Sequence, residues 1–120
     1  WDRLEPGAEH IAAIGADTAA GQPAPPILGY ARLLPVDEDG WAQLRQVAVT
    51  HSLRGLGIGR RLVQAAETRA CELGARGLWL NARLPAVGFY ERLGYEVFSG
   101  EFITGLANLP HVKMRRRLGA

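Results

Sequence analysis

The sequence predicts an α/β fold in which a mixed central sheet begins as an antiparallel meander and continues in the order β-α-β-α-β-β. Three observations predict this fold. Short apolar segments are separated by turns in the first fifty residues, the apolar spacing becomes helical after Gly59, and short strand-like segments return after Gly77. The chain has 120 residues, of which 48% are hydrophobic and 22% charged, so we expect a single globular domain over residues 1–120.

The first half of the chain predicts three strands. Residues 9–15, 27–34 and 44–50 are mostly apolar and suit strands. Residues 16–26 are rich in Ala, Gly and Pro, and proline has no amide hydrogen and a fixed φ, so this stretch is predicted to be a loop. Residues 37–40, Asp-Glu-Asp-Gly, predict a polar turn before the third strand.

The second half predicts two helices among further strands. Helical spacing relates the apolar positions Leu62, Val63, Ala66, Ala70 and Leu73. Gly74 predicts the end of this helix, and residues 77–82 predict the next strand. Pro85 predicts the start of a second helix that ends at Gly94, and residues 95–98 and 111–118 predict the last two strands.

The composition excludes several classes of protein. A single cysteine, Cys71, excludes an intramolecular disulfide framework, and no His or Cys spacing suggests a metal site. The net charge of +2, from 14 basic and 12 acidic residues, does not by itself argue for nucleic acid, and the sequence reveals no aromatic and basic face. No apolar run of about 18 residues is present, so we expect no membrane span and a cytoplasmic protein.

A glycine cluster lies between the third predicted strand and the first predicted helix. Residues 54–61 read Arg-Gly-Leu-Gly-Ile-Gly-Arg-Arg. Glycine allows close approach of a ligand to the backbone, and the first turn of a helix offers unpaired amides and the positive end of the helix dipole. The cluster therefore suits a pyrophosphate. A glycine-rich turn without a ligand is the alternative, but three glycines carry a large entropic cost for a turn alone.

Two common phosphate motifs do not fit these residues. A Walker loop needs Lys and then Ser or Thr after its last glycine, and Gly59 is followed by arginines. A dinucleotide fingerprint, Gly-x-Gly-x-x-Gly, places Arg60 or Leu62 at its last position.

The same residues resemble the GNAT superfamily. Residues 54–59 look like its acyl-CoA signature, Arg/Gln-x-x-Gly-x-Gly/Ala, and Val47-Ala48-Val49 resembles the strand that pairs with pantetheine. Residues 86–95, Ala-Val-Gly-Phe-Tyr-Glu-Arg-Leu-Gly-Tyr, resemble the later helix–turn–strand segment of the family, and residues 101–114 look like its ElaA-type branch. The resemblance covers roughly residues 28–118.

The resemblance implies a cofactor and its site. Acetyl-CoA would lie where the strands at 44–50 and 77–82 splay apart, with its pyrophosphate on the amides of residues 55–60. Many members carry Asn where this chain has Arg83, so that contact is in doubt and Asn81 is the substitute. The cofactor-binding residues that follow are Val47, Ala48, Val49, Arg54, Gly55, Leu56, Gly57, Ile58, Gly59, Arg60 and Asn81.

Tyr90 is the residue that the resemblance places at the chemistry. Its family counterpart often protonates the leaving thiolate, and a phenol with a pKa of about 10 is an adequate acid for a thiolate of pKa about 8–9. Tyr90 also falls on the apolar stripe of its predicted helix, so a core aromatic is the alternative. Glu101 and His111 are candidates for a general base beside the acceptor, and His10 and His51 are others, although a lone histidine more often has a structural role.

The sequence leaves the function open between classes. The leading hypothesis is an N-acetyltransferase that uses acetyl-CoA and a primary amine of a small molecule or protein. A non-catalytic acyl-CoA-binding or regulatory domain is the alternative, and a nucleic-acid module ranks last. The family fold begins with a strand and two helices that wall the acceptor site, and Trp1 resembles the segment after them, so we expect an N-terminally incomplete domain whose exposed apolar surface favours a homodimer.

Overall fold

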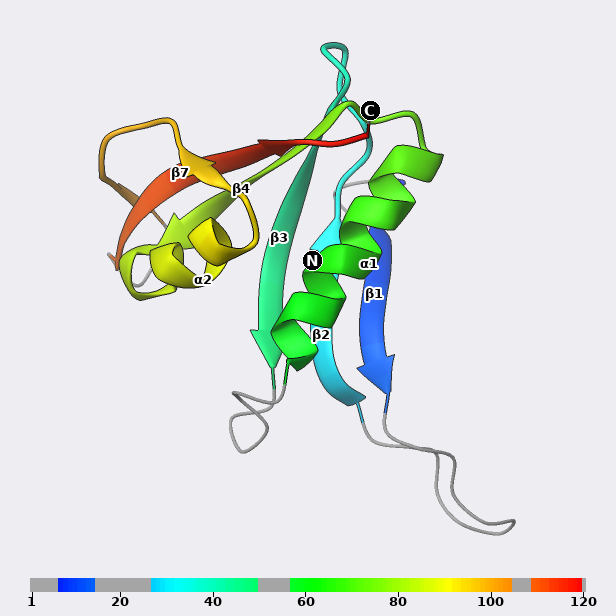
Figure 1. The fold of residues 1–120 in the computed structure, drawn as a ribbon, viewed down its shortest axis with the longest axis horizontal. Helices are drawn as coiled ribbons and strands as arrows, with labels where there is room; N and C mark the ends of the chain where they lie inside the picture. Colours follow the sequence, from blue (N-terminus) through cyan, green and yellow to red (C-terminus); the bar gives the residue numbers. More distant parts are fainter. Residues whose placement is uncertain (1–6, 15–26, 50–56, 105–108, 120) are drawn as a thin grey trace, which may run out of the picture.

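The fold is a mixed sheet with helices on one face (Figure 1). The computed structural model describes residues 7–14, 27–49, 57–104 and 109–119. Its strands are β1 (Glu9–Ile14), β2 (Ile27–Leu33), β3 (Trp41–Val49), β4 (Gly77–Arg83), β5 (Glu96–Val97), β6 (Phe102–Thr104) and β7 (Leu109–Arg117). Its helices are α1 (Ile58–Glu72), the short 3-10 helix η3 (Leu84–Ala86) and α2 (Val87–Arg92). The strand order is β1-β2-β3-β4-β7-β5, and β6 pairs with β7.

The predicted α/β class is confirmed and every predicted element is present. The differences are local: the 3-10 helix η3 precedes α2, β7 begins at Leu109 instead of His111, and β6 and the start of β3 also differ. The three-residue strand β6 was missed, because its span is too short to show a period. Strand β3 begins three residues earlier than predicted. Asp37 begins the turn before β3. Its carboxylate accepts hydrogen bonds from the amides of Asp39 and Trp41 at 2.8 and 3.0 Å, which allows Trp41 to enter the sheet. The ring of Trp41 then covers Gly77 on the neighbouring strand, where no larger residue would fit.

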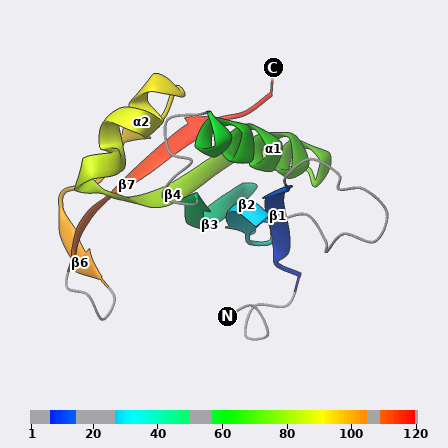
Figure 2. The same ribbon diagram turned by 90° about the horizontal axis from the view of Figure 1, so that it is seen from below.

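One apolar core lies between the sheet and the two helices. Figure 2 shows α1 and α2 on the same side of the strands. Alternate residues of β3, β4 and β7 are buried there, as the pleat of a strand requires. The core is lined by Ala31, Leu33, Ala42, Leu44, Val63, Ala66, Ala70, Leu78, Leu80, Tyr90, Tyr95 and Met114, among others. The opposite face of β3, β4 and β7 carries polar and aromatic side chains.

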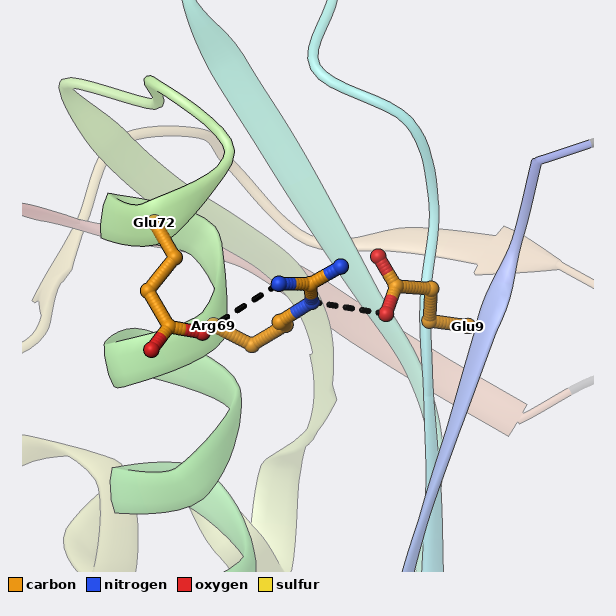
Figure 3. Close-up of polar contacts among 3 residues, drawn as sticks. All are labelled: Glu9, Arg69 and Glu72. Atoms are coloured by element: carbon orange, nitrogen blue, oxygen red, sulfur yellow. Dashed lines mark hydrogen bonds and ion pairs between the residues drawn. The ribbon is translucent and has the colours of Figure 1, made fainter.

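Helix α1 is attached to the edge of the sheet by an ion pair. Arg69 Nε donates to Glu9 on β1 at 2.7 Å, and its Nη1 donates to Glu72 at 3.3 Å (Figure 3). Both pairs are partly exposed, so they add little to stability and mainly fix the orientation of α1 over β1. No helix in the described part of the chain is long and apolar enough to cross a membrane.

Strands β3 and β4 pair over only part of their lengths. The parallel register runs from Trp41 opposite Gly77 to Leu44 opposite Leu80. Beyond this point β3 continues to Val49 and β4 to Arg83 without further pairs between them. An irregularity in the β2–β3 register coincides with Gln46, whose φ of 56° is left-handed. This bulge bends β3 away from β4, because an extra residue on one strand increases its local twist.

Candidate active site

A cavity of about 480 Å³ lies where β3 and β4 separate. Its lining includes four of the residues that the sequence singled out, which come from four different elements: Val47 on β3, Asn81 on β4, Tyr90 on α2 and His111 on β7. The remaining lining residues are Gln43, Leu44, Arg45, Gln46, Leu80, Ala82, Arg83, Ala86 and Leu109. The splayed pair of strands thus produces a site from residues that are far apart in the sequence, from Gln43 to His111.

Tyr90 has its ring in the core and borders the cavity. The residue is only 7% exposed, and its ring meets the rings of Phe89 and Tyr95 edge to face, with centroids 4.9 and 5.8 Å away. No described residue forms a hydrogen bond with its hydroxyl. Burial raises the pKa of Tyr90 to about 12, so the phenol carries its proton at neutral pH. The two sequence hypotheses for Tyr90, core aromatic and site residue, are therefore compatible in one side chain.

Tyr95 holds the ring against which Tyr90 packs. Its hydroxyl donates to Glu67 on α1 at 2.8 Å, and Arg116 on β7 donates to the same carboxylate oxygen at 2.9 Å. Burial first, and then the hydrogen bond to Glu67, raise the pKa of Tyr95 far above its ordinary value. This cluster ties α1, the segment after α2 and β7 together behind the cavity.

His111 has a fixed orientation at the cavity. Its Nδ1 lies 2.7 Å from the backbone carbonyl of Leu109, which can only accept, so Nδ1 carries a hydrogen and donates. Its ring also stacks on Phe102, with centroids 6.0 Å apart. In the neutral ring this arrangement leaves the Nε2 lone pair available. Glu101, the other candidate base, is exposed and is not among the residues that line the cavity.

The described part of the glycine cluster lies at the start of α1. Gly57 is the residue before the helix and has a φ of +82°, a conformation that favours glycine. Neither an acidic residue nor a side-chain cap occupies the first turn of α1, so this end of the helix is electrostatically suited to an anion. Gly59 faces Phe89 and Val49, and an added Cβ would come within 3.2 Å of the Phe89 ring. Ile58 and Arg60 belong to the same first turn.

The other predicted cofactor residues either lie outside the described residues or do not line the cavity. Arg54, Gly55 and Leu56 lie outside the described residues. Ala48 and Val49 pair with Tyr30 and Gly29 on β2 and do not line the cavity.

Sequence reasoning missed part of the lining and one neighbouring surface. Gln43, Arg45 and Gln46 belong to β3, and only the register of the sheet places them at the cavity. A second hollow of about 290 Å³ is lined by Asp37, Trp41, Trp79, Phe98, Lys113 and Arg115. This aromatic and basic surface was not evident in the sequence, because it combines residues from three strands and two connecting segments. Its signal was the alternation of Lys113 and Arg115 with the apolar residues Val112 and Met114 along β7.

Comparison with known proteins identifies the family. The model of the acetyltransferase (GNAT) family matches residues 3–95. The chain belongs to this family. YjcF of Bacillus subtilis (strain 168), named an uncharacterized N-acetyltransferase, is 34% identical over 116 residues, which are 96% of this chain and 74% of YjcF.

Several solved structures share the fold of this chain. An aminoglycoside 6'-N-acetyltransferase complexed with coenzyme A superposes with a TM-score of 0.77 at 18% identity, covering 98% of this chain and 76% of that one. Escherichia coli ElaA superposes with a TM-score of 0.71 at 22% identity, covering 92% and 68%. At these identities the likeness shows the fold alone.

The family assignment bears on the predicted function. It confirms the GNAT prediction and supports an acetyl-CoA-dependent N-acetyltransferase over a non-catalytic acyl-CoA-binding domain. Among residues 7–14, 27–49, 57–104 and 109–119, no three His, Cys, Asp or Glu side chains gather as metal ligands would.

Proposed function

We propose that this chain transfers an acetyl group directly from acetyl-CoA to a primary amine in the cavity between β3 and β4. The observation that carries the proposal is the convergence of Val47, Tyr90 and His111 on one cavity at the point where the two strands separate. Acetyl-CoA supplies a thioester whose carbonyl carbon accepts the amine. The residues of the chain bind this thioester, orient it and move two protons.

Backbone groups carry most of the proposed cofactor binding. The end of β3 beyond Leu44 has no β4 partner, so Val47 can offer its backbone to the pantetheine amides. Asn81 on the facing strand supplies an amide side chain. The first turn of α1, with Gly57, Ile58, Gly59 and Arg60, suits the pyrophosphate, and Arg54, Gly55 and Leu56 precede it in the sequence.

Two side chains would handle the protons. His111 Nε2 accepts a proton from the amine as the bond between nitrogen and the acetyl carbon forms. Tyr90 donates its phenolic proton to the sulfur as the carbon–sulfur bond breaks, and the products are an N-acetyl amide and a thiol. Because burial raises the pKa of Tyr90 to about 12, the phenol is in its donating form at neutral pH. His111 is favoured over Glu101 as the base, since only His111 lines the cavity.

Calorimetric titration with acetyl-CoA tests this proposal, with NADH and ATP as controls. We expect saturable binding of acetyl-CoA alone, and loss of binding in Gly57→Asp, which places a carboxylate at the proposed anion site. Tyr90→Phe should retain binding within about twofold and lower kcat by about 100-fold, because only the acid is removed. Failure of the folded chain to bind acetyl-CoA, or full activity of Tyr90→Phe, would contradict the corresponding part of the proposal.

Two further predictions concern the cellular compartment and the oligomeric state of the enzyme. We place the enzyme in the cytoplasm, on the ground that its reaction consumes acetyl-CoA. The homodimer expected from the sequence stays a prediction, and the elution volume in size-exclusion chromatography checks it.

A further inference from the structure

The cavity wall has a marked charge asymmetry. Arg45 on β3 and Arg83 on β4 both line the cavity, and His111 lies opposite Arg83 in the β4–β7 register. No Asp or Glu is present among the described lining residues. The segments 50–56 and 105–108, which follow β3 and precede β7, contain no Asp or Glu in their sequences either.

The cationic residues lie on the side of the sheet away from the helices. Leu80 and Ala82 are buried under the helices, so the alternating residues Asn81 and Arg83 point to the opposite face. Tyr90 reaches the same cavity from α2, on the helix side. A molecule that enters from the open face and approaches Tyr90 therefore passes the arginines.

We infer that the acceptor is a primary amine that also carries a carboxylate or phosphate group, held by Arg45 and Arg83. The inference rests on the proposed function. Guanidinium groups form paired, charge-assisted hydrogen bonds with such anions, and no described residue forms an ion pair with Arg83. A polycationic acceptor, in contrast, would meet like charges and no described carboxylate in the cavity.

The positive surface continues away from the cavity along β7. Lys113 lies opposite Asn81 in the register, with Nζ 5.7 Å from the centre of the Trp79 ring, and Arg115 lies 4.8 Å from the centre of the Phe98 ring. The nearby carboxylate of Asp37 already accepts two turn amides, and Arg115 already donates to Glu96 at 3.2 Å. An acidic peptide would therefore meet Lys113 as a further cation beyond its first residue, whereas a small amino acid would use only Arg45 and Arg83.

The test uses two acceptor series whose anionic and neutral members differ in charge and share one acceptor amine, whereas the cationic members carry additional amines. The small series is 4-aminobutanoate, 4-aminobutanamide and 1,4-diaminobutane, which present a negative, neutral or positive end on a chain of equal length. The peptide series is Asp-Asp-Gly-Gly amide, Asn-Asn-Gly-Gly amide and Lys-Lys-Gly-Gly amide. Release of coenzyme A gives kcat/KM, and titration of the same compounds into the coenzyme A complex and into the free chain gives binding without turnover.

We expect the anionic member of at least one series to exceed its neutral partner about tenfold, with the advantage falling at high salt. Arg83→Gln and Arg45→Gln should lower this preference about three- to tenfold with KM for acetyl-CoA unchanged, and Arg83→Glu should shift it toward the diamine. Arg92→Gln, an exposed arginine on α2 outside the cavity lining, removes the same charge as a control and should change nothing. A larger effect in the peptide series would identify an acidic peptide as the acceptor.

Three outcomes would overturn the inference. The first is that the neutral or diamine acceptors are used as well as the anionic ones or better. The second is that the arginine variants change KM for acetyl-CoA and leave the preference among acceptors unchanged. The third is that binding shows no preference for any charge. Failure to bind acetyl-CoA would defeat the proposed function instead, and the charge preference of the free chain would still be measurable.

Discussion

Tyr90 illustrates how one residue serves both the core and the site. Its ring packs between Phe89 and Tyr95, and it also borders the cavity. A sequence can place this residue on an apolar helix stripe, and the resemblance of its neighbours to a family can suggest its chemistry. Which of the candidate bases accompanies it depends on the path of β7, which the sequence alone does not reveal. Arg45 and Arg83 were not predictable as a pair for the same reason, since they meet only across the splayed strands.

His111 can be tested directly as the proposed general base. Replacement by Gln keeps a side chain of similar size and removes the proton acceptor, so we expect kcat to fall about 100-fold while acetyl-CoA binding is unchanged.

Two variants control the interpretation of His111→Gln. His10→Gln alters an exposed histidine on β1, away from the cavity lining, and should leave kcat unchanged. Glu101→Gln should also have little effect. A large loss of kcat in Glu101→Gln with normal activity in His111→Gln would assign the base to Glu101.

At the scale of elements, the glycines of the sequence predicted the ends of the helices, but no residue predicted the bulge in β3. The glycine run before α1 and the glycines that end α1 and α2 predicted helix boundaries within one or two residues. The bulge at Gln46 has a left-handed φ without a glycine, so no residue type marked it. Because this bulge separates β3 from β4, the exact lining of the cavity could not follow from the sequence.

Replacing two glycines by alanine should change the free energy of unfolding in opposite directions, one at a helix boundary and one inside a helix. Gly57→Ala should lower the free energy of unfolding by about 1 kcal/mol, because alanine is strained at the φ of +82° before α1. Gly88→Ala should raise it by about 0.5–1 kcal/mol, because Gly88 lies inside α2 and an added Cβ makes only ordinary contact with the end of the Arg92 side chain. Urea unfolding of both variants checks the signs, and stabilisation by both would contradict the left-handed geometry at Gly57.

At the scale of the molecule, two parts of the sheet meet at a short seam. Strands β1–β3 lie on one side and β4, β7, β5 and β6 on the other, and β3 and β4 share four register pairs (Figure 1). Helix α1 packs across this seam, and its Glu67 binds Tyr95 and Arg116 of the second part. The seam explains how the sheet can open for a ligand on one edge and stay joined elsewhere. The resemblance to the GNAT family implied that the two strands splay apart, but the Glu67 cluster required the three-dimensional structure.

The buried tyrosines of this second part predict a loss of stability in alkali. Burial raises the pKa of Tyr90 to about 12 and that of Tyr95 further, compared with about 10 in the unfolded chain. The folded chain therefore holds these protons more tightly, so the contribution to stability is complete below pH 10 and is lost as pH rises from 10 toward 12. Urea unfolding at pH 9, 10.5 and 11.5 should show this decline, about 2 kcal/mol for Tyr90 alone at the end of the window.

The variants Tyr90→Phe and Tyr95→Phe separate this effect from general alkaline damage. Each removes one ionisable hydroxyl and keeps the ring contacts, so the decline between pH 10 and 12 should be shallower in each single variant and shallowest in the double variant. Tyr95→Phe should also cost about 1–2 kcal/mol at pH 7, because Glu67 loses a hydrogen bond. An unchanged alkaline slope in the double variant would mean that the fold does not raise the pKa of these hydroxyls, and the burial of Tyr90 and Tyr95 would not account for the loss of stability in alkali.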